Sequence, residues 1–222
     1  MISNIIFPGW AMPPYYYKPY EGDIVDYGFF RKDETFDFDG FALPGPGDCI
    51  ITAHSMGSLL ALKAASLNPQ VKALILFSPF ACFCEAPGCP GQNEESVLKM
   101  IEQVEISSER LLKSFYRTLV RPSSFKIGVP EFLNKNILRA GLEFLLRSDC
   151  RDCLENIKIP VLIMLGGRDE ISPLIMGKYL AEKLSDVALH LFEDAGHALP
   201  FTDTEECRIK IRNFLDEKNL IA

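Results

Sequence analysis

The stretch that decides the fold is residues 49–62, CIITAHSMGSLLAL. An apolar run of strand character ends directly before Ser55, and an apolar run of helical character follows it. A serine between a buried strand and a helix lies on a sharp turn that lifts its hydroxyl clear of the sheet. Such turns usually read Gly-x-Ser-x-Gly, because the positions two before and two after the serine crowd together. Gly57 fits this pattern, and Ala53 departs from it by one methyl group.

The same alternation of strand and helix continues along the rest of the 222 residues. Most of the apolar runs are nearly continuous, which is typical of strands covered on both faces of a parallel sheet. The predicted strands are 4–7, 22–29, 49–54, 71–78, 160–166 and 187–193, and the predicted helices are 56–67, 173–184 and 203–217. The pattern predicts one α/β domain over residues 1–222, with a mostly parallel, doubly wound sheet.

One segment, from about residue 94 to 157, interrupts this alternation with helical periodicity alone. Within it, residues 107–120 begin with helix-capping residues, and residues 134–150 carry a helical apolar stripe. So long a helical insertion between two strands favours a lid over the carboxyl edge of the sheet, and ordinary packing helices are the alternative.

The charge of the chain is unevenly distributed. The net charge is −7, which argues against nucleic acid as the main partner, because phosphate binding needs a basic surface. Between residues 110 and 147, however, eight lysines and arginines face only two glutamates. Two interpretations stay open: a solvated helical face, or a docking surface for an acidic partner.

Composition also bears on location and on metals. No apolar stretch is long enough to span a membrane, and the N-terminus has no basic or long apolar region, so we expect neither a membrane segment nor an export signal. Seven cysteines in such a chain indicate reduced thiols and a cytoplasmic location. The clusters Cys82/Cys84/Cys89 and Cys150/Cys153 do not have a common zinc spacing, and we expect no metal site.

A serine nucleophile needs a base, and the chain has three histidines. His54 neighbours the serine on an extended strand, where its side chain points away, and His190 lies inside a strand pattern. His197 follows the last predicted strand and is the base by position and by elimination. Asp169 follows the strand 160–166 and is favoured over Glu170 as the acid that orients the base. The order Ser55, Asp169, His197 differs from the orders found in trypsin and subtilisin.

The oxyanion of an acyl-transfer intermediate needs two hydrogen-bond donors. The loop after the first predicted strand offers the backbone N–H of Trp10, and the start of the helix after Ser55 offers that of Met56. The only tryptophan can also be a core anchor, and the two roles are compatible. This chemistry requires no metal and no organic cofactor.

Four motifs together, PGWAM, AHSMG, GGRDEISP and AGHALPF, resemble the α/β-hydrolase superfamily. Within it, residues 138–173 are most similar to the pimeloyl-[acyl-carrier protein] methyl ester esterases of biotin synthesis. Three features depart from that family: the leading hairpin is absent, the segment between Trp10 and Cys49 is short, and Ala53 replaces the first glycine of the turn.

The resemblance implies a serine carboxylesterase that forms an acyl-enzyme on Ser55 and releases methanol from a small-molecule or carrier-linked acyl ester. It also implies an acidic acyl carrier protein as partner, with an apolar and basic lid. The residues implied in substrate or carrier binding are Phe115, Tyr116, Arg117, Arg121, Phe132, Arg139 and Phe144. Two alternatives stay open: a thioesterase with the same catalytic residues, and a non-catalytic, hydrolase-like binding protein.

Overall fold

A computed structural model describes residues 2–43, 45 and 47–220. Within these residues, parallel strands form one sheet in the order β2-β1-β3-β4-β5-β6. The strands are β1 (Ser3–Phe7), β2 (Asp23–Ile24), β3 (Cys49–His54), β4 (Val71–Phe77), β5 (Val161–Gly166) and β6 (Val187–Phe192). From β1 the chain adds β2 at one edge of the sheet. It then returns to the other side of β1 and adds β3, β4, β5 and β6 in order toward the opposite edge. Ligands bind at such a reversal point, beyond the carboxyl ends of the strands, and here it falls between β1 and β3.

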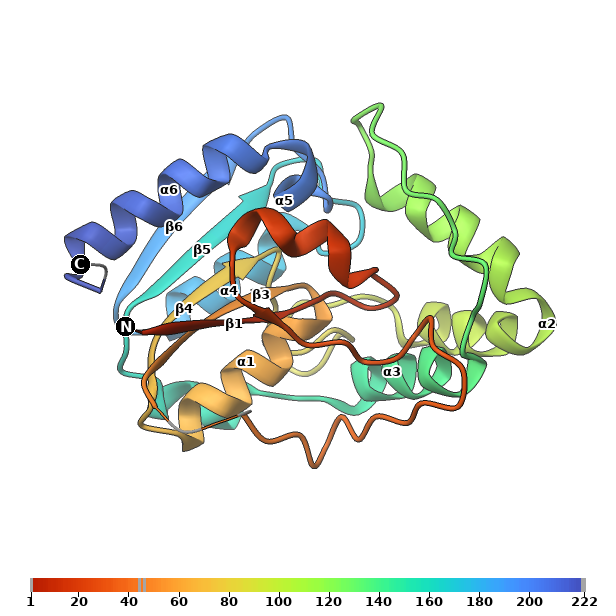
Figure 1. The fold of residues 1–222 in the computed structure, drawn as a ribbon, viewed down its shortest axis with the longest axis horizontal. Helices are drawn as coiled ribbons and strands as arrows, with labels where there is room; N and C mark the ends of the chain where they lie inside the picture. The colour runs from red at the N-terminus through yellow and green to blue at the C-terminus, as the bar shows by residue number, and fades with distance from the viewer. Residues whose placement is uncertain (1, 44, 46, 221–222) are drawn as a thin grey trace.

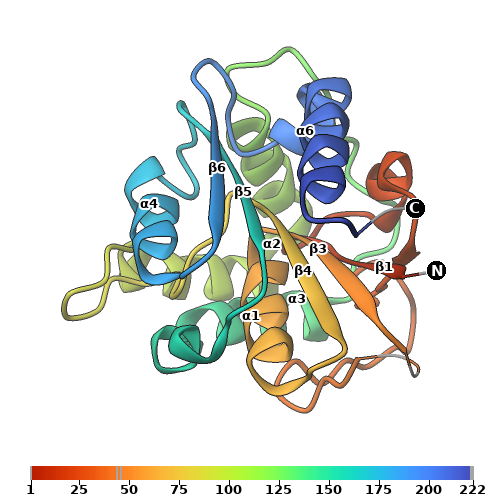
Figure 2. The same cartoon turned by 90° about the vertical axis from the view of Figure 1, so that its left-hand side faces the viewer.

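Helices cover both faces of the sheet. Figure 2 shows α1 (Met56–Leu67) and α4 (Leu174–Lys183) on one face and α6 (Thr204–Glu217) on the other. The short helix α5 (Leu199–Thr202) precedes α6, and the 3₁₀ helix η1 (Pro14–Tyr20) follows β1. Every residue of β3 and of β5 is buried. This double covering explains why the central strands read as nearly unbroken apolar runs.

The predicted helical insertion lies between β4 and β5 and contains α2 (Glu94–Leu119), α3 (Lys135–Arg147) and the 3₁₀ helix η2 (Arg151–Asn156). Figure 1 shows α2 and α3 beyond the carboxyl ends of the strands. The side chain of Asn93 caps α2 by accepting a hydrogen bond from the Glu95 N–H. Ser107 is non-helical, with φ −161° and ψ 81°, and divides α2 at a kink. The second part of α2 therefore starts where the capping residues predict a helix start.

The predicted strand 22–29 is also too long, because only Asp23 and Ile24 form β2. The chain leaves the sheet after Ile24 and turns at Gly28, whose φ is +80°, a conformation that glycine adopts without steric cost. Beyond β2, Tyr27 and Phe29 pack against Phe38 in an aromatic cluster instead of continuing the strand. Alternation of apolar residues does not distinguish a strand from such a cluster.

Within the described part of the chain, none of the helices is both long and apolar enough to cross a membrane.

Candidate active site

Ser55 lies on the sharp turn that the sequence predicts, between the end of β3 and the start of α1. Its backbone is at φ 53° and ψ −120°, a strained conformation for a residue with a side chain. The backbone N–H of Ser55 donates to the Phe77 carbonyl over 3.0 Å, and the Ser58 hydroxyl donates to the Ser55 carbonyl over 2.6 Å. Hydrogen bonds on both sides therefore hold the strained residue in place.

The neighbours of Ser55 show why the turn needs small residues. A Cβ on Gly57 would lie 2.3 Å from the carbonyl oxygen of Phe7 and 2.7 Å from that of Pro8, so no side chain fits there. Ala53 lies in β3 between Phe7 and Leu76 and is almost completely buried. The turn keeps its shape with this one additional methyl group.

Asp169 and His197 form a buried pair at the same edge of the sheet. His197 Nδ1 lies 2.7 Å from Asp169 Oδ2, and each side chain is 1% exposed. The other carboxylate oxygen, Oδ1, accepts hydrogen bonds of 2.8 Å from the backbone N–H groups of Ile171 and Ser172. These bonds fix the carboxylate, which in turn selects the tautomer of His197 that carries its proton on Nδ1.

His197 Nε2 is then free to act as an acceptor. This atom is buried and has no hydrogen-bond partner within the described residues. A buried polar atom without a partner is uncommon. Among the described residues, the Ser55 hydroxyl is therefore not hydrogen-bonded to His197 Nε2. Glu170, the alternative acid, lies elsewhere: its carboxylate is at the rim of the cavity, 3.7 Å from the Arg121 guanidinium.

The loop after β1 lies directly against Ser55. A Cβ on Gly9 would be 3.3 Å from the Cβ of Ser55. Trp10 follows Gly9, and Met56 follows Ser55. Among the described residues, the backbone N–H groups of Trp10 and Met56 have no acceptor. The Trp10 side chain is an anchor as well, because its indole N–H donates to the Leu138 carbonyl over 2.8 Å and its ring packs on Phe115.

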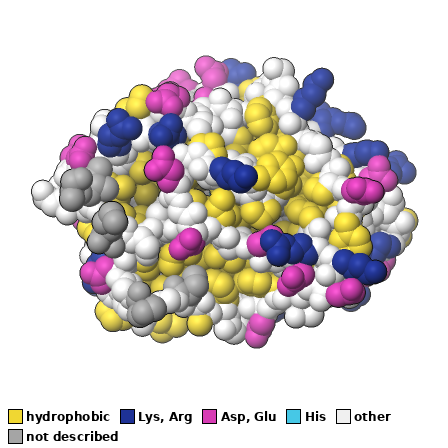
Figure 3. All heavy atoms as spheres, in the orientation of Figure 1, with side chains coloured by type: hydrophobic (Ala, Val, Ile, Leu, Met, Phe, Trp, Pro, Cys, Tyr) yellow, Lys and Arg dark blue, Asp and Glu magenta, His cyan; other side chains and the backbone are white. Residues whose placement is uncertain are grey.

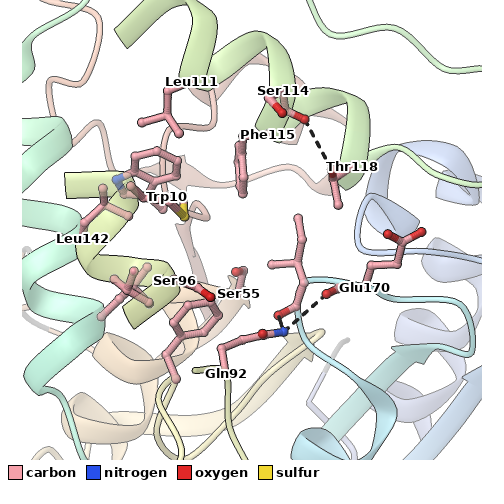
Figure 4. Close-up of a pocket in the computed structure, with 15 residues that line it drawn as sticks. Trp10, Ser55, Gln92, Ser96, Leu111, Ser114, Phe115, Thr118, Leu142 and Glu170 are labelled. Atoms are coloured by element: carbon pink, nitrogen blue, oxygen red, sulfur yellow. Dashed lines mark hydrogen bonds between the residues drawn. The ribbon is translucent and has the colours of Figure 1, made fainter. Parts of the chain in front are cut away.

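Ser55 forms part of the wall of a cavity of about 280 Å³ between the sheet edge and the helical insertion. Figure 4 shows Trp10 and Leu142 on the left of the cavity, Ser114, Phe115 and Thr118 of α2 above it, and Glu170 on the right. Most of the lining is apolar: Trp10, Phe83, Val97, Met100, Leu111, Phe115, Leu142, Leu145 and Ile171. Gln92 holds the wall near Asp169 by donating to the Ile171 carbonyl over 3.0 Å. The sequence analysis missed all of these residues except Trp10 and Phe115, because no motif marks them.

Three aromatic residues expected to bind substrate or carrier do not line this cavity. Phe144 is fully buried against Phe38, Tyr116 is buried with its hydroxyl donating to the Ala11 carbonyl, and Phe132 is exposed. Phe144 and Tyr116 therefore serve packing of the helices on which they lie.

The basic charge of the insertion is partly neutralised by ion pairs. Two carboxylates outside the 110–147 stretch take part: Glu105 lies 3.6 Å from Arg139, and Asp39 pairs with Arg147. Within the stretch, Glu143 lies 2.8 Å from Arg139. Arg117 is exposed and lines a groove on the far side of α2 together with Lys126. Figure 3 shows Lys and Arg side chains gathered at the end of the molecule that carries α2 and the segment after it.

The cysteines are free thiols, as the sequence indicates. Cys82 Sγ and Cys89 Sγ lie 2.6 Å apart, and Cys153 donates to the Cys150 carbonyl. No group of three or more Cys, His, Asp or Glu residues in the described chain is arranged to hold a metal ion.

Comparison with known proteins agrees with this geometry. Residues 34–205 match the family model described as serine aminopeptidase, S33. The chain is an α/β hydrolase.

A pimeloyl-[acyl-carrier protein] methyl ester esterase from Nitrosomonas europaea is 30% identical over 173 residues, which cover 72% of this chain and 68% of the relative. The esterase of the same name from Aromatoleum aromaticum is 28% identical over 76% of this chain and 74% of its own length. These relatives bear out the predicted family and the predicted class of carboxylic ester hydrolase.

Solved structures show the same fold at low identity. An esterase from Exiguobacterium antarcticum superposes with a TM-score of 0.81 at 20% identity, covering 96% of this chain and 92% of that one. A bromoperoxidase from Bacillus anthracis gives 0.82 at 14% identity, covering 97% and 92%. These likenesses confirm the predicted α/β-hydrolase fold.

Proposed function

We propose that the protein is a serine esterase whose catalytic triad is Ser55, His197 and Asp169. The observation that carries the proposal is His197 Nε2, a buried acceptor without a partner, on a ring fixed by Asp169 and at the sheet edge where Ser55 is held in a strained turn. Ser55 Oγ attacks the ester carbonyl while His197 Nε2 takes its proton. The N–H groups of Trp10 and Met56 stabilise the oxyanion.

The second half of the reaction uses the same groups. His197 returns the proton to the departing alcohol, and water then attacks the acyl-enzyme with His197 again acting as base. Asp169 stabilises the imidazolium at each stage without taking the proton itself.

The proposed substrate is an acyl methyl ester attached to an acyl carrier protein, with pimeloyl as the acyl chain and methanol as the leaving alcohol. Two facts support it: the relatives carry this activity in their names, and the cavity beside Ser55 is mainly apolar. In this proposal α2 and α3 act as a lid whose inner residues, Phe115 and Leu142 among them, cover the acyl chain.

The decisive variant is Ser55→Ala. We expect kcat for a short p-nitrophenyl ester to fall at least about 10⁴-fold, because the nucleophile is lost while the cavity remains. Ser66→Ala, on the far part of the same helix, is the control and should keep wild-type turnover. Circular dichroism checks that both variants are folded. Wild-type turnover in Ser55→Ala would reject the triad.

The ester class is tested by comparing turnover of a small acyl methyl ester with that of a small thioester of the same acyl chain, both without a carrier. The proposal expects a kcat/KM at least about tenfold higher for the methyl ester, since the leaving group is then the only difference. The reverse preference would make the protein a thioesterase with the same site.

Carrier docking is a further part of the proposal and rests on Arg117 and Arg121. Reversing both to glutamate should lower kcat/KM for a carrier-linked ester at least about tenfold and leave the free ester unchanged, because complementary charge mainly accelerates encounter. Arg139→Glu is the matched control, because two carboxylates hold the Arg139 guanidinium, that of Glu143 at 2.8 Å and that of Glu105 at 3.6 Å, whereas Arg121 has a single, longer contact of 3.7 Å with Glu170. Equal losses on both substrates would argue against docking at this surface.

A further inference from the structure

The geometry points to a positioning role for two residues that no motif marks, His54 and Tyr17. We infer that they form a neutral hydrogen-bonded bridge between the oxyanion loop and the loop that carries the general base. The inference rests on the proposed function, because it concerns the placement of the proposed catalytic groups.

The bridge consists of three consecutive hydrogen bonds. The Gly9 N–H donates to the Tyr17 hydroxyl oxygen over 2.9 Å, and that hydroxyl lies 2.7 Å from His54 Nδ1. At the other end, His54 Nε2 lies 3.0 Å from the backbone carbonyl oxygen of His197. These bonds join Gly9, which precedes Trp10, to His197 itself.

The chemistry of the end groups fixes the direction of every bond. A carbonyl oxygen only accepts, so His54 carries its proton on Nε2. Nδ1 of the neutral ring is then an acceptor, and the Tyr17 O–H donates to it. The Tyr17 oxygen still has a lone pair for the Gly9 N–H. All the polar atoms of the bridge are thus satisfied in one arrangement.

Burial keeps this arrangement neutral. His54 and Tyr17 are both 0% exposed. Desolvation lowers the pKa of His54 well below its usual value, and the neighbouring His197 lowers it further. Desolvation also raises the pKa of Tyr17. The rings packed on His54 include the apolar Phe201. The hydrogen bond to the His197 backbone favours the charged form of His54, but desolvation outweighs it and the net shift of the pKa is downward.

The consequence is that His197 is held from two sides. Asp169 fixes its ring through Nδ1, and His54 fixes its backbone through the carbonyl oxygen. Because His54 immediately precedes Ser55, the same residue relates the base to the nucleophile and, through Tyr17, to the oxyanion loop. Misplacement of a reacting group by about 1 Å is enough to lower a rate about 100-fold.

The first test is Tyr17→Phe, which removes one hydroxyl and leaves the ring. We expect kcat for a p-nitrophenyl ester, expressed per active site titrated with a fluorophosphonate, to fall at least about tenfold with little change in KM. The matched control is Tyr20→Phe, on the same η1 helix. It likewise removes a buried hydroxyl, but one that donates to the Pro200 carbonyl and is not part of the bridge. This control should keep wild-type kcat per titrated site.

Per-site kcat separates positioning from stability. A merely structural role would lower the number of titratable sites and leave the turnover of each site unchanged. Equal per-site kcat in Tyr17→Phe and Tyr20→Phe would therefore overturn the bridge.

The second test uses the other half of the bridge. His54→Gln can present an amide N–H toward the His197 carbonyl, whereas His54→Leu cannot. The per-site kcat of His54→Gln should therefore be at least about tenfold higher than that of His54→Leu. Wild-type per-site kcat in a folded His54→Leu would overturn the inference.

The two levels of proposal fail differently. If Ser55→Ala retains turnover and the fluorophosphonate does not label Ser55, the proposed function is wrong. If Ser55 is labelled and required but Tyr17→Phe has normal per-site kcat, only the bridge is wrong.

Discussion

Gly57 is the residue whose size most directly determines the geometry of the nucleophile. A methyl group there would meet the backbone of β1 at Phe7 and Pro8, which cannot move without displacing the oxyanion loop. We expect Gly57→Ala to lower the free energy of unfolding by at least about 2 kcal/mol, which corresponds to a Tm lower by about 4–8 °C. Activity should fall as well. Thermal unfolding and p-nitrophenyl ester turnover measure the two effects.

Two other substitutions serve as controls for this prediction. A Cβ on Gly128 would meet no atom within 4 Å, so Gly128→Ala should leave both Tm and turnover unchanged. Ala53→Gly restores the usual first residue of the turn and should leave activity unchanged. A Gly57→Ala variant as stable as Gly128→Ala would contradict the crowding argument.

At the same scale, the positions of Ser55, Asp169 and His197 at one sheet edge were predictable from the sequence, but the contacts that support them were not. All three residues follow strand ends, and a strand end is visible as the boundary of an apolar run. Tyr17 is not visible in this way, because its contact with His54 is tertiary and no local pattern encodes it. The bond from His54 to the His197 carbonyl could not be foreseen for the same reason.

At the scale of elements, the contact between α3 and the loop after β1 links the helical insertion to the oxyanion donors. The Trp10 indole N–H donates to the Leu138 carbonyl. A Cβ on Gly141 would lie only 2.7 Å from Trp10 Cδ1. We expect Gly141→Ala to displace the indole and to lower kcat/KM about tenfold. Since Trp10 is the only tryptophan, its fluorescence emission reports the displacement directly.

Asn136→Ala is the matched control, because it also introduces alanine into α3 but at an exposed position. It should change neither the emission maximum nor kcat/KM. A shift in emission without a loss of activity in Gly141→Ala would show that the oxyanion loop tolerates movement of the Trp10 side chain.

Elements with a continuous apolar run were predictable within a residue or two, as β3, α1 and β5 show. Prediction failed where the periodicity is shared between structures. The apolar positions around Tyr27 fit a strand but belong to an aromatic cluster. The cavity wall was unpredictable for a further reason: helices α2 and α3 each present one face to the sheet, and only the tertiary arrangement shows which side chains remain beside Ser55.

At the scale of the whole molecule, the buried and neutral His54 makes stability depend on pH. Its pKa in the folded protein lies well below the value of about 6.5 expected in the unfolded chain. Below pH 6.5 the unfolded state therefore binds a proton that the folded state does not. The stability present above pH 6.5 is lost as the pH falls toward the folded pKa, by up to about 1.4 kcal/mol per pH unit.

Urea unfolding at pH 8, 7, 6 and 5 measures this slope, and the choice of variants assigns it. His54→Gln has no titrating group at this position and should lose the His54 part of the slope. His190 is partly exposed on β6 and its pKa is lowered mainly by desolvation, so His190→Gln should leave most of the slope in place. A wild-type slope in His54→Gln would place the acid-sensitive group elsewhere. Loss of the His54 part of the slope in His54→Gln would show that the folded protein holds this imidazole neutral, so the geometry proposed for catalysis and the acid limit of the fold would depend on the same proton.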